Sequence, residues 1–195
     1  MTLLSAAVLM FFVMDPLGNV PFFLSAVRHV EKSRQRRVIA RELLIALAVL
    51  VFFLFLGQYI LDVLHISATA LRISGGVVLL LIALRMIFPT PDNSMREEVA
   101  GEPFIVPLAV PYTAGPSALA TELLLVSREP ERWPVWLGAV LLAWFATALI
   151  LYSATSVSRY LGDRGLIAIE RLMGMLLITV AVQMLMDGLS QALAR

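Results

Sequence analysis

Six long apolar runs dominate the sequence and constrain its fold more than any other feature. Each run approaches or exceeds the about 20 apolar residues that a helix needs to cross the hydrocarbon core of a membrane. In lipid such a run must be helical, because every backbone amide needs an internal partner. The runs cover residues 3–27, 43–61, 71–88, 104–126, 135–157 and 166–189. We therefore expect an all-α polytopic membrane protein with six transmembrane helices.

The composition supports this class, and the length of the chain leaves little room for a separate soluble domain. The 195-residue chain is 60% apolar and 15% charged, against about 45–50% and about 25% in soluble domains. Six spans take about 120 residues, so we expect one transmembrane domain over residues 1–195. The chain has no cysteine and two histidines, which argues against a disulfide and against a metal site.

Basic residues are concentrated in the first connection and indicate the orientation of the chain. Six of the fifteen Lys and Arg residues lie within residues 28–41, and such residues favour the cytoplasmic side. With the other connections included, nine basic residues fall inside and three outside. We predict a multi-pass cell-membrane protein, which means the inner membrane if the cell is Gram-negative, with residues 28–41 as a cytoplasmic loop and both termini outside. Contact of this loop with anionic lipid or a protein partner is the alternative explanation.

Proline and glycine interrupt two of the six runs at similar places. Two prolines and a glycine within seven residues predict a non-helical break near the bilayer midplane. The first run contains Asp15-Pro16-Leu17-Gly18-Asn19-Val20-Pro21, and the fourth contains Pro111-Tyr112-Thr113-Ala114-Gly115-Pro116-Ser117. We expect the first and fourth helices to be interrupted, with about fourteen residues in the two breaks.

The third and sixth runs also correspond, and this predicts an internal repeat. The third contains Arg72 and Gly75 followed by Ala83, and the sixth contains Arg171 and Gly174 followed by Ala181. A unit of three spans must enter the membrane from the opposite face in its second copy, as in many secondary transporters. We predict two inverted repeats, residues 1–90 and 103–195, joined by a connecting loop at 91–102. The glycines Gly75, Gly76 and Gly174 are expected to be close helix-packing points.

The expected breaks would expose backbone groups that suit a small zwitterion. A half-helix that begins at Pro116 with Gly115 as its N-cap, and another that begins at Pro16 or Pro21, would direct amides towards a carboxylate. The halves that precede them end in carbonyls that suit an ammonium group or a sodium ion. The candidate substrate-binding residues are Asp15, Pro16, Gly18, Asn19, Pro21, Thr113, Ala114, Gly115, Pro116 and Ser117.

Several polar residues have both a structural and a functional interpretation. Asp15 is a ligand, a proton carrier or only a helix cap, and Asn19 binds substrate or pairs with freed backbone groups. Thr113 and Ser117 line the site or bond within their own helices. Glu122 lies at the membrane interface or at the mouth of a pathway.

These residues resemble the MarC family of six-span integral membrane proteins, and most closely its YhgN-like branch. The resemblance covers essentially the whole chain. It is most specific at Asp15-Pro16, Gly18-Asn19, Pro21 and Phe23 with Ala114-Gly115-Pro116, and it extends to Arg41-Glu42, Leu71-Arg72-Ile73 and Gly75-Gly76. The family usually has glycine where this chain has Ser117, which narrows the site or adds a hydroxyl contact. The resemblance implies transport of small neutral amino acids.

We therefore expect a secondary transporter of glycine, alanine and serine that works by alternating access. No cofactor is expected, and either H⁺ or Na⁺ is a candidate coupling ion. The expected partners are the amino acid and the lipid bilayer, without nucleic acid, and a homo-oligomer is left open. A channel, or a membrane subunit that assists another complex, is the alternative. We expect no enzyme, because the chain has no Gly-x-Ser-x-Gly, His-Glu-x-x-His or P-loop sequence.

Overall fold

The computed structural model describes residues 1–27, 30–88, 104–105 and 108–193, and the elements that it contains are helices. They are α1 (Leu3–Met14), α2 (Pro16–Ala26), α3 (Lys32–Val63), α4 (Ala68–Ile87), the π-helical segment η1 (Leu108–Thr113), α5 (Pro116–Arg128), the short 3-10 helix η2 (Pro130–Arg132), α6 (Trp133–Tyr152) and α7 (Ala154–Leu193). The all-α prediction is confirmed for this part of the chain. The predicted connecting loop at 91–102 lies outside it, as does Arg28.

Five segments of the described chain are long and apolar enough to cross a membrane. They are Leu3–Val20, Lys32–Val63, Thr69–Ile87, Pro130–Tyr152 and Arg164–Leu193. The predicted fourth span, 104–126, differs because it is divided between η1, with 6 residues, and α5, with 13. Neither piece alone reaches the length that a bilayer requires. Of the six expected spans, five are therefore present as segments of spanning length. The fourth is a divided run, and residues 106–107 within it lie outside the described chain.

Helix α3 is longer than the sequence predicted and changes the first connection. It begins at Lys32, so most of the expected loop at 28–41 is helical. Gln35 holds this start in place, because its side-chain amide donates to the carbonyls of Val27 and Val30 at 3.0 and 3.1 Å. Straight-chain residues such as Lys, Arg and Gln favour a helix, which explains why the basic segment joins α3.

The fifth connection is also more helical than expected. Helix α6 ends at Tyr152 and α7 already begins at Ala154. Within α7, Gly162 has a φ of 64° and a ψ of 173°, which interrupts the helical backbone. The segment from Arg164 onwards forms the last span.

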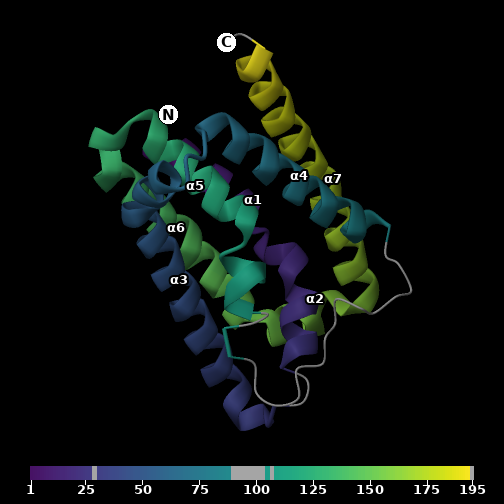
Figure 1. Cartoon of the computed structure of the whole chain (residues 1–195). Helices are drawn as coiled ribbons and strands as arrows, with labels where there is room; N and C mark the ends of the chain where they lie inside the picture. Colours follow the sequence, from purple (N-terminus) through teal and green to yellow (C-terminus); the bar gives the residue numbers. More distant parts are fainter. Residues whose placement is uncertain (28–29, 89–103, 106–107, 194–195) are drawn as a thin grey trace.

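Helices α4 and α7 lie side by side and run antiparallel (Figure 1). A Cβ atom added at Gly76 would lie 3.2 Å from the carbonyl oxygen of Ala181, and one at Gly174 would lie 3.1 Å from that of Ala83. A Cβ atom at Gly75 would lie 2.7 Å from the Cβ atom of Ala120 on α5. The predicted packing role of these glycines is confirmed, because side chains there would force the helices apart.

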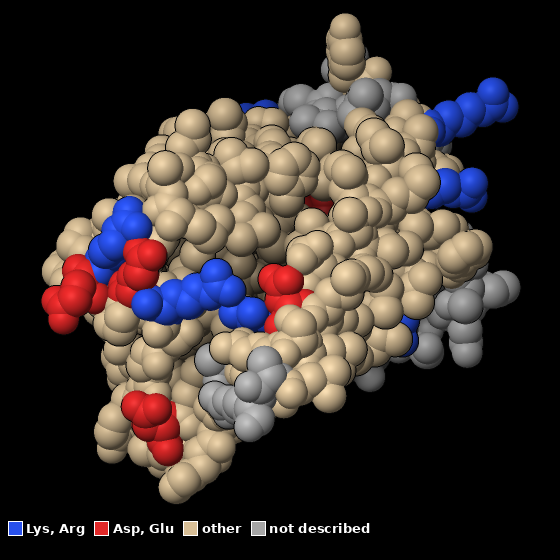
Figure 2. All heavy atoms as spheres, turned by 90° about the horizontal axis from the view of Figure 1, so that it is seen from above, with Lys and Arg blue, Asp and Glu red and all other residues tan. Residues whose placement is uncertain are grey.

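The other helices pack against this pair or against one another. Helix α1 packs on α6 and η1 on α3, while α2 packs on α7 and α6, and α5 packs on α4 and α3. The start of α1 and the end of α7 lie at one end of the bundle, and the start of α3 lies at the opposite end (Figure 1). Figure 2 shows the molecule from above the view of Figure 1. Acidic and basic side chains are few on this face, and some acidic side chains lie next to basic ones.

The outward faces of the long helices carry large apolar side chains. Leu4, Phe55, Phe145 and Leu149 are examples, each at least half exposed. A soluble monomer rarely shows apolar surface on this scale. In a membrane protein, these faces contact lipid.

Candidate functional site

The first break consists of one residue, Asp15. Its backbone is left-handed, with a φ of 42° and a ψ of 61°, a conformation that aspartate tolerates better than most residues. The Asp15 amide donates to the carbonyls of Phe11 and Phe12 and ends α1, while its Oδ1 atom accepts a hydrogen bond of 3.1 Å from the Gly18 amide. Asp15 therefore closes one helix and caps the next.

The expectation of a seven-residue break here is wrong. Helix α2 begins at Pro16 and continues through Gly18, Asn19 and Pro21. Proline is favoured in the first position of a helix, where its missing amide hydrogen is not needed. The helix then passes Pro21 at the loss of one backbone hydrogen bond.

Gly18 is required by the close approach of the Asp15 carboxylate. A Cβ atom at Gly18 would overlap Asp15 Oδ2 and the Cε atom of Met86 on α4. The absence of a side chain at Gly18 thus allows the Asp15 carboxyl group to contact the start of α2 and Met86 of α4 to pack against the same position.

The second break is longer and is built differently. Val110 has an extended backbone, with a φ of −130° and a ψ of 127°, inside the π-helical segment η1. The Thr113 hydroxyl donates to the carbonyl of Leu108 at 3.0 Å, so it bonds within its own segment. Helix α5 begins at Pro116 with Gly115 as its N-cap, as predicted, and no side chain caps it.

The two proline pairs are therefore not equivalent in the structure. In the first break the helix begins at the first proline of the pair, Pro16, and in the second it begins at the second proline, Pro116. The matching spacing predicted two interruptions, but it did not predict which proline would start each helix.

Asn19 joins the two breaks. Its side-chain amide donates to the carbonyl of Met14 at 2.9 Å, where α1 ends, and to the carbonyl of Tyr112 at 2.7 Å, in η1. The rings of Phe22 and Tyr112 stack beside it, with centroids 5.1 Å apart. Of the two interpretations of Asn19, this conformation shows the pairing with freed backbone carbonyls.

The predicted residues near this junction are mostly buried. Asp15, Gly18, Thr113, Ala114 and Gly115 are buried. Pro16 and Ser117 are buried as well, whereas Pro116 is exposed. Within the described residues, no group of His, Cys, Asp and Glu side chains could hold a metal ion.

The two helix starts differ in what they offer a ligand. The start of α2 is capped by the Asp15 carboxyl group, which accepts a hydrogen bond from the Gly18 amide. The amides at the start of α5 have no side-chain cap. The two helix starts, which the sequence predicted to attract an anion alike, therefore differ: the start of α2 is capped by a side chain and the start of α5 is not.

An ion pair between the partly exposed Arg41 and the buried Glu42 contacts the chain that leads into η1. Glu42 is fully buried, and its Oε1 atom lies 2.9 Å from Nη2 of Arg41. Its Oε2 atom accepts a hydrogen bond of 2.7 Å from the amide of Ile105. The Arg41 guanidinium also lies 5.1 Å from the centre of the Phe104 ring. The sequence marked this Arg-Glu pair only through the family resemblance.

Glu122 lies inside the bundle, a burial that neither of its two interpretations predicted. It is on α5 and has no exposed surface. The sequence feature that could have indicated this burial is the position of an acidic residue within the apolar run 104–126.

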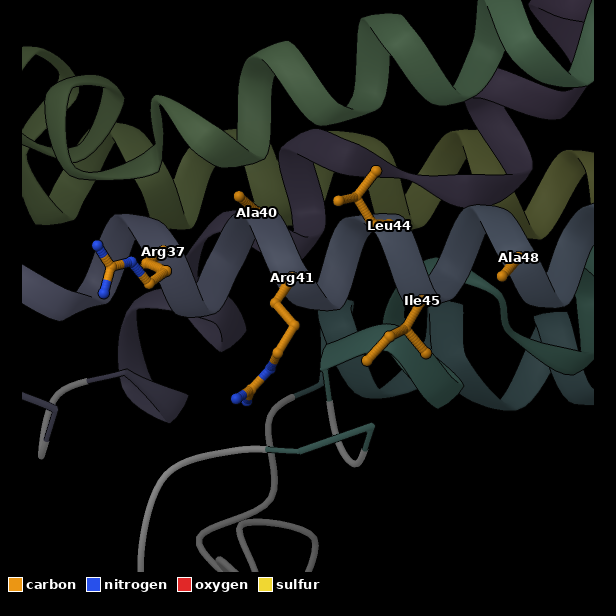
Figure 3. A pocket seen from close by; sticks show the side chains of 6 residues that line it. All are labelled: Arg37, Ala40, Arg41, Leu44, Ile45 and Ala48. Atoms are coloured by element: carbon orange, nitrogen blue, oxygen red, sulfur yellow. The ribbon is translucent and has the colours of Figure 1, made fainter.

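A shallow depression of about 450 Å³ lies on an outward face of α3 (Figure 3). Its lining residues are Arg37, Ala40, Arg41, Leu44, Ile45 and Ala48. All six belong to α3, and none is a predicted substrate residue. The depression is therefore separate from the junction of the two breaks.

Comparisons with known proteins agree over almost the whole chain. The model of the MarC family of integral membrane proteins matches residues 1–193. The UPF0056 inner membrane protein YhgN of Escherichia coli K12 is 48% identical over 188 residues, which is 96% of this chain and 95% of that protein. A UPF0056 membrane protein of Buchnera aphidicola from Schizaphis graminum is 42% identical over 187 residues, 96% of this chain and 95% of its own.

More distant relatives extend the agreement. A UPF0056 membrane protein of Chlamydia muridarum is 29% identical over 192 residues, which is 98% of this chain and 94% of that protein. No solved structure matches the chain. From the family match over residues 1–193 and the similarity to YhgN, we conclude that this all-α, multi-pass chain belongs to the MarC family of integral membrane proteins.

Proposed function

We propose that this chain is a secondary transporter of small neutral amino acids such as glycine, alanine and serine. The observation that carries the proposal is the contact of the two breaks through Asn19, which bonds to Met14 and Tyr112. Interrupted helices that meet inside a bundle are where many secondary transporters hold their substrate. The proposal includes no enzymatic step, no cofactor and no nucleic-acid partner.

A zwitterion suits the chemistry of this junction. The uncapped amides at the start of α5 attract a carboxylate. The Asp15 carboxylate, together with the carbonyls of Met14 and Tyr112, suits an ammonium group that takes the place of the Asn19 amide. Small residues at the junction, Ala114 and Gly115, favour a substrate with a small side chain.

Paired helix contacts support an arrangement of two inverted repeats, residues 1–90 and 103–195, with a linker at 91–102. In such an arrangement each contact has a counterpart in the other half. The contact of α2 with α7 has its counterpart in that of α5 with α4, and the contact of α1 with α6 in that of η1 with α3. Gly76 and Gly174 approach Ala181 and Ala83 in the same reciprocal way. Rocking of one half against the other would then expose the junction to each side in turn.

We extend the proposal to an orientation in an inner membrane, the location named for the relative YhgN. Residues 28–41 would be cytoplasmic and both termini outside. The exposed basic residues at the start of α3 favour the cytoplasmic side. The position of the start of α1 and the end of α7 at the opposite end of the bundle is consistent with this orientation.

Counterflow in liposomes tests the transport function. Purified protein should exchange labelled glycine, alanine or serine, and the rate should saturate with substrate. Gly115→Leu should weaken the apparent affinity about tenfold or more, since an overpacked contact costs about 1–3 kcal/mol. Ala48→Leu is the matched control, because it adds similar bulk on an exposed face of α3.

Two results would count against this function. Wild-type protein that exchanges no amino acid under any ion gradient would contradict the proposed substrate class. A flux that rises linearly with concentration and shows no counterflow would favour a channel instead.

A further inference from the structure

Glu122 on α5 differs from the other buried acids in having no partner. Both of its carboxyl oxygens are buried, and neither has a hydrogen-bond partner among the described residues. Buried Asp15 accepts a hydrogen bond from the Gly18 amide, and buried Glu42 pairs with Arg41. Burying an unpaired carboxylate is costly, so this environment suits a neutral, protonated carboxyl group.

The position of Glu122 on α5 places it among apolar side chains. Ala118, one turn before it, and Leu125 and Val126, one turn after it, belong to a buried apolar cluster. Residues three and four positions apart share a helix face, so Glu122 lies on the face of α5 that packs into this cluster. The cluster also includes Ala6, Ala7 and Met10 of α1 and residues of α3 and α6.

Helix α1 runs antiparallel to α5 along this face. The N-terminal ammonium group of Met1 lies 4.0 Å from the carboxylate of Glu129, just beyond the end of α5. At the other end, Met14 of α1 belongs to the same apolar cluster as Ala114 and Ala118. Glu122 therefore lies about halfway along the contact of two interrupted helices, where a movement of one against the other would change its surroundings.

The helices around Glu122 carry charged and titratable side chains, but none of these pairs with it. Helix α1 has none between Leu3 and Met14. On the other elements packed against α5 they are Lys32, Arg34, Arg36, Arg37, Arg41, Glu42, Tyr59 and Asp62 on α3, Arg72 and Arg85 on α4, Tyr152 on α6, and Glu131 and Arg132 on η2. Within the described chain, none of them donates a hydrogen bond to the Glu122 carboxyl.

Glu122 is mechanically connected to the substrate junction. Helix α5 starts at the second break, and Glu122 follows the N-cap Gly115 along this helix by about 10 Å at 1.5 Å per residue. A rigid movement of α5 would carry the carboxyl group and the uncapped amides together. An ion at Glu122 and a substrate at the junction would then affect the same movement.

The surroundings favour a proton over a sodium ion. Sodium is held in transporters by several oxygen ligands, such as backbone carbonyls at helix breaks. Glu122 instead lies within the continuous helix α5, away from the breaks, and no hydroxyl of the described residues donates a hydrogen bond to its oxygens. A proton needs only the carboxylate itself.

We propose that Glu122 is the proton-binding site that couples a proton gradient to substrate movement. The proposal rests on the transport function proposed above. A proton from the water on one side binds the carboxylate when the contact of α1 and α5 opens to that side. It leaves to the water on the other side when the contact opens there, and only the O–H bond forms and breaks.

Gradient-driven uptake of glycine into proteoliposomes tests this coupling. With one proton per substrate, a pH difference of one unit across the membrane supports about tenfold accumulation. We expect a ratio of uptake with the gradient to uptake without it near this value for the wild type and near one for Glu122→Gln. The matched control is Glu129→Gln, a carboxylate outside the membrane at the end of the same helix, which should keep the wild-type ratio.

The ratio separates this proposal from the transport function itself. A Glu122→Gln ratio as high as that of the wild type would overturn the role of Glu122 and leave transport intact. A wild-type protein that exchanges glycine but has a ratio of one would also overturn it. Absence of glycine exchange in the wild type would overturn the transport function.

If Glu122→Gln does not fold, chemical labelling of the wild-type protein tests whether Glu122 binds a proton. Dicyclohexylcarbodiimide reacts with protonated carboxyl groups in apolar surroundings and leaves an N-acylurea that mass spectrometry can assign to a peptide. We expect labelling of Glu122 at acidic pH that slows as the pH rises, and faster or slower labelling when glycine is added. Absence of labelling at every pH, or a rate independent of pH, would overturn the proposal.

Discussion

The first and second breaks differ in the residue that precedes the proline at the start of the new helix. At the first break this residue is Asp15, which ends α1 and caps α2 with its own carboxylate. At the second it is Gly115, which leaves the start of α5 without a side-chain cap. Two similar patterns of proline and glycine thus give one helix start that a side chain caps and one that no side chain caps.

The strongest test of this comparison removes the link between the breaks. Asn19→Ala leaves the carbonyls of Met14 and Tyr112 without their donor. A buried acceptor left unpaired costs about 1–3 kcal/mol, so we expect a loss of about 2–4 kcal/mol in stability, measured by thermal unfolding in detergent. Gln183→Ala is the matched control, because that amide donates to Asp187 on an exposed face. Equal melting of Asn19→Ala and wild type would contradict the bridging role.

The next test asks whether Asp15 acts as a cap or as a charge. Asp15→Ala removes the acceptor of the Gly18 amide, and the loss of an N-cap costs about 0.5–2 kcal/mol. Asp15→Asn keeps an acceptor and tolerates the left-handed backbone, so it should melt close to the wild type. If both variants are equally destabilised, the negative charge matters more than the cap.

A smaller effect on stability is expected when the second break is made to resemble the first. Gly115→Asp places a carboxylate before the uncapped amides of α5 and should change stability by about 1 kcal/mol or less. The same carboxylate would occupy the place proposed for the substrate carboxylate. Glycine should raise the melting temperature of the wild type, because a ligand that binds only the folded state stabilises it, and this shift should be lost in Gly115→Asp. A retained shift would place the substrate elsewhere.

The smallest effect concerns the contacts of Glu129, which lies between the start of α1 and the end of α5. The hydrogen bond from Arg132 holds the pKa of Glu129 below its ordinary value, and the Met1 ammonium group adds to this. A carboxyl with a lowered pKa stabilises the folded state above its ordinary pKa, and this is lost as the pH falls through the lowered value. Glu129→Gln should therefore melt slightly below the wild type at pH 7, and the difference should vanish in acid. A constant difference would show that the charge is not its cause.

The spans were largely predictable, and their ends were less so. The hydropathy of the chain identified the long helices, because lipid admits only segments with internally paired backbones. The sequence did not show that α3 begins at Lys32, since this boundary depends on Gln35 bonding back to Val27 and Val30. Such a contact forms only after α2 and α3 are in place.

The candidate site was predictable in its location but not in its details. Proline and glycine located both interruptions, and the start of α5 at Pro116 was predicted correctly. Sequence reasoning expected Asn19 to bind substrate or to pair with backbone groups, and its partner Tyr112 lies 93 positions away. It missed the burial of Glu122, because a single acid near the end of an apolar run is also typical of a membrane interface.

The sequence by itself determined the membrane class, the all-α character and the residues at which two helices are interrupted. These depend on local properties: apolar length, a missing amide hydrogen at proline and the capping ability of Asp15. Only the tertiary structure decided that the two breaks meet through Asn19 and that Glu122 lies unpaired between helices. Burial and hydrogen-bond pairing depend on segments far apart in the chain, so no local pattern determines them.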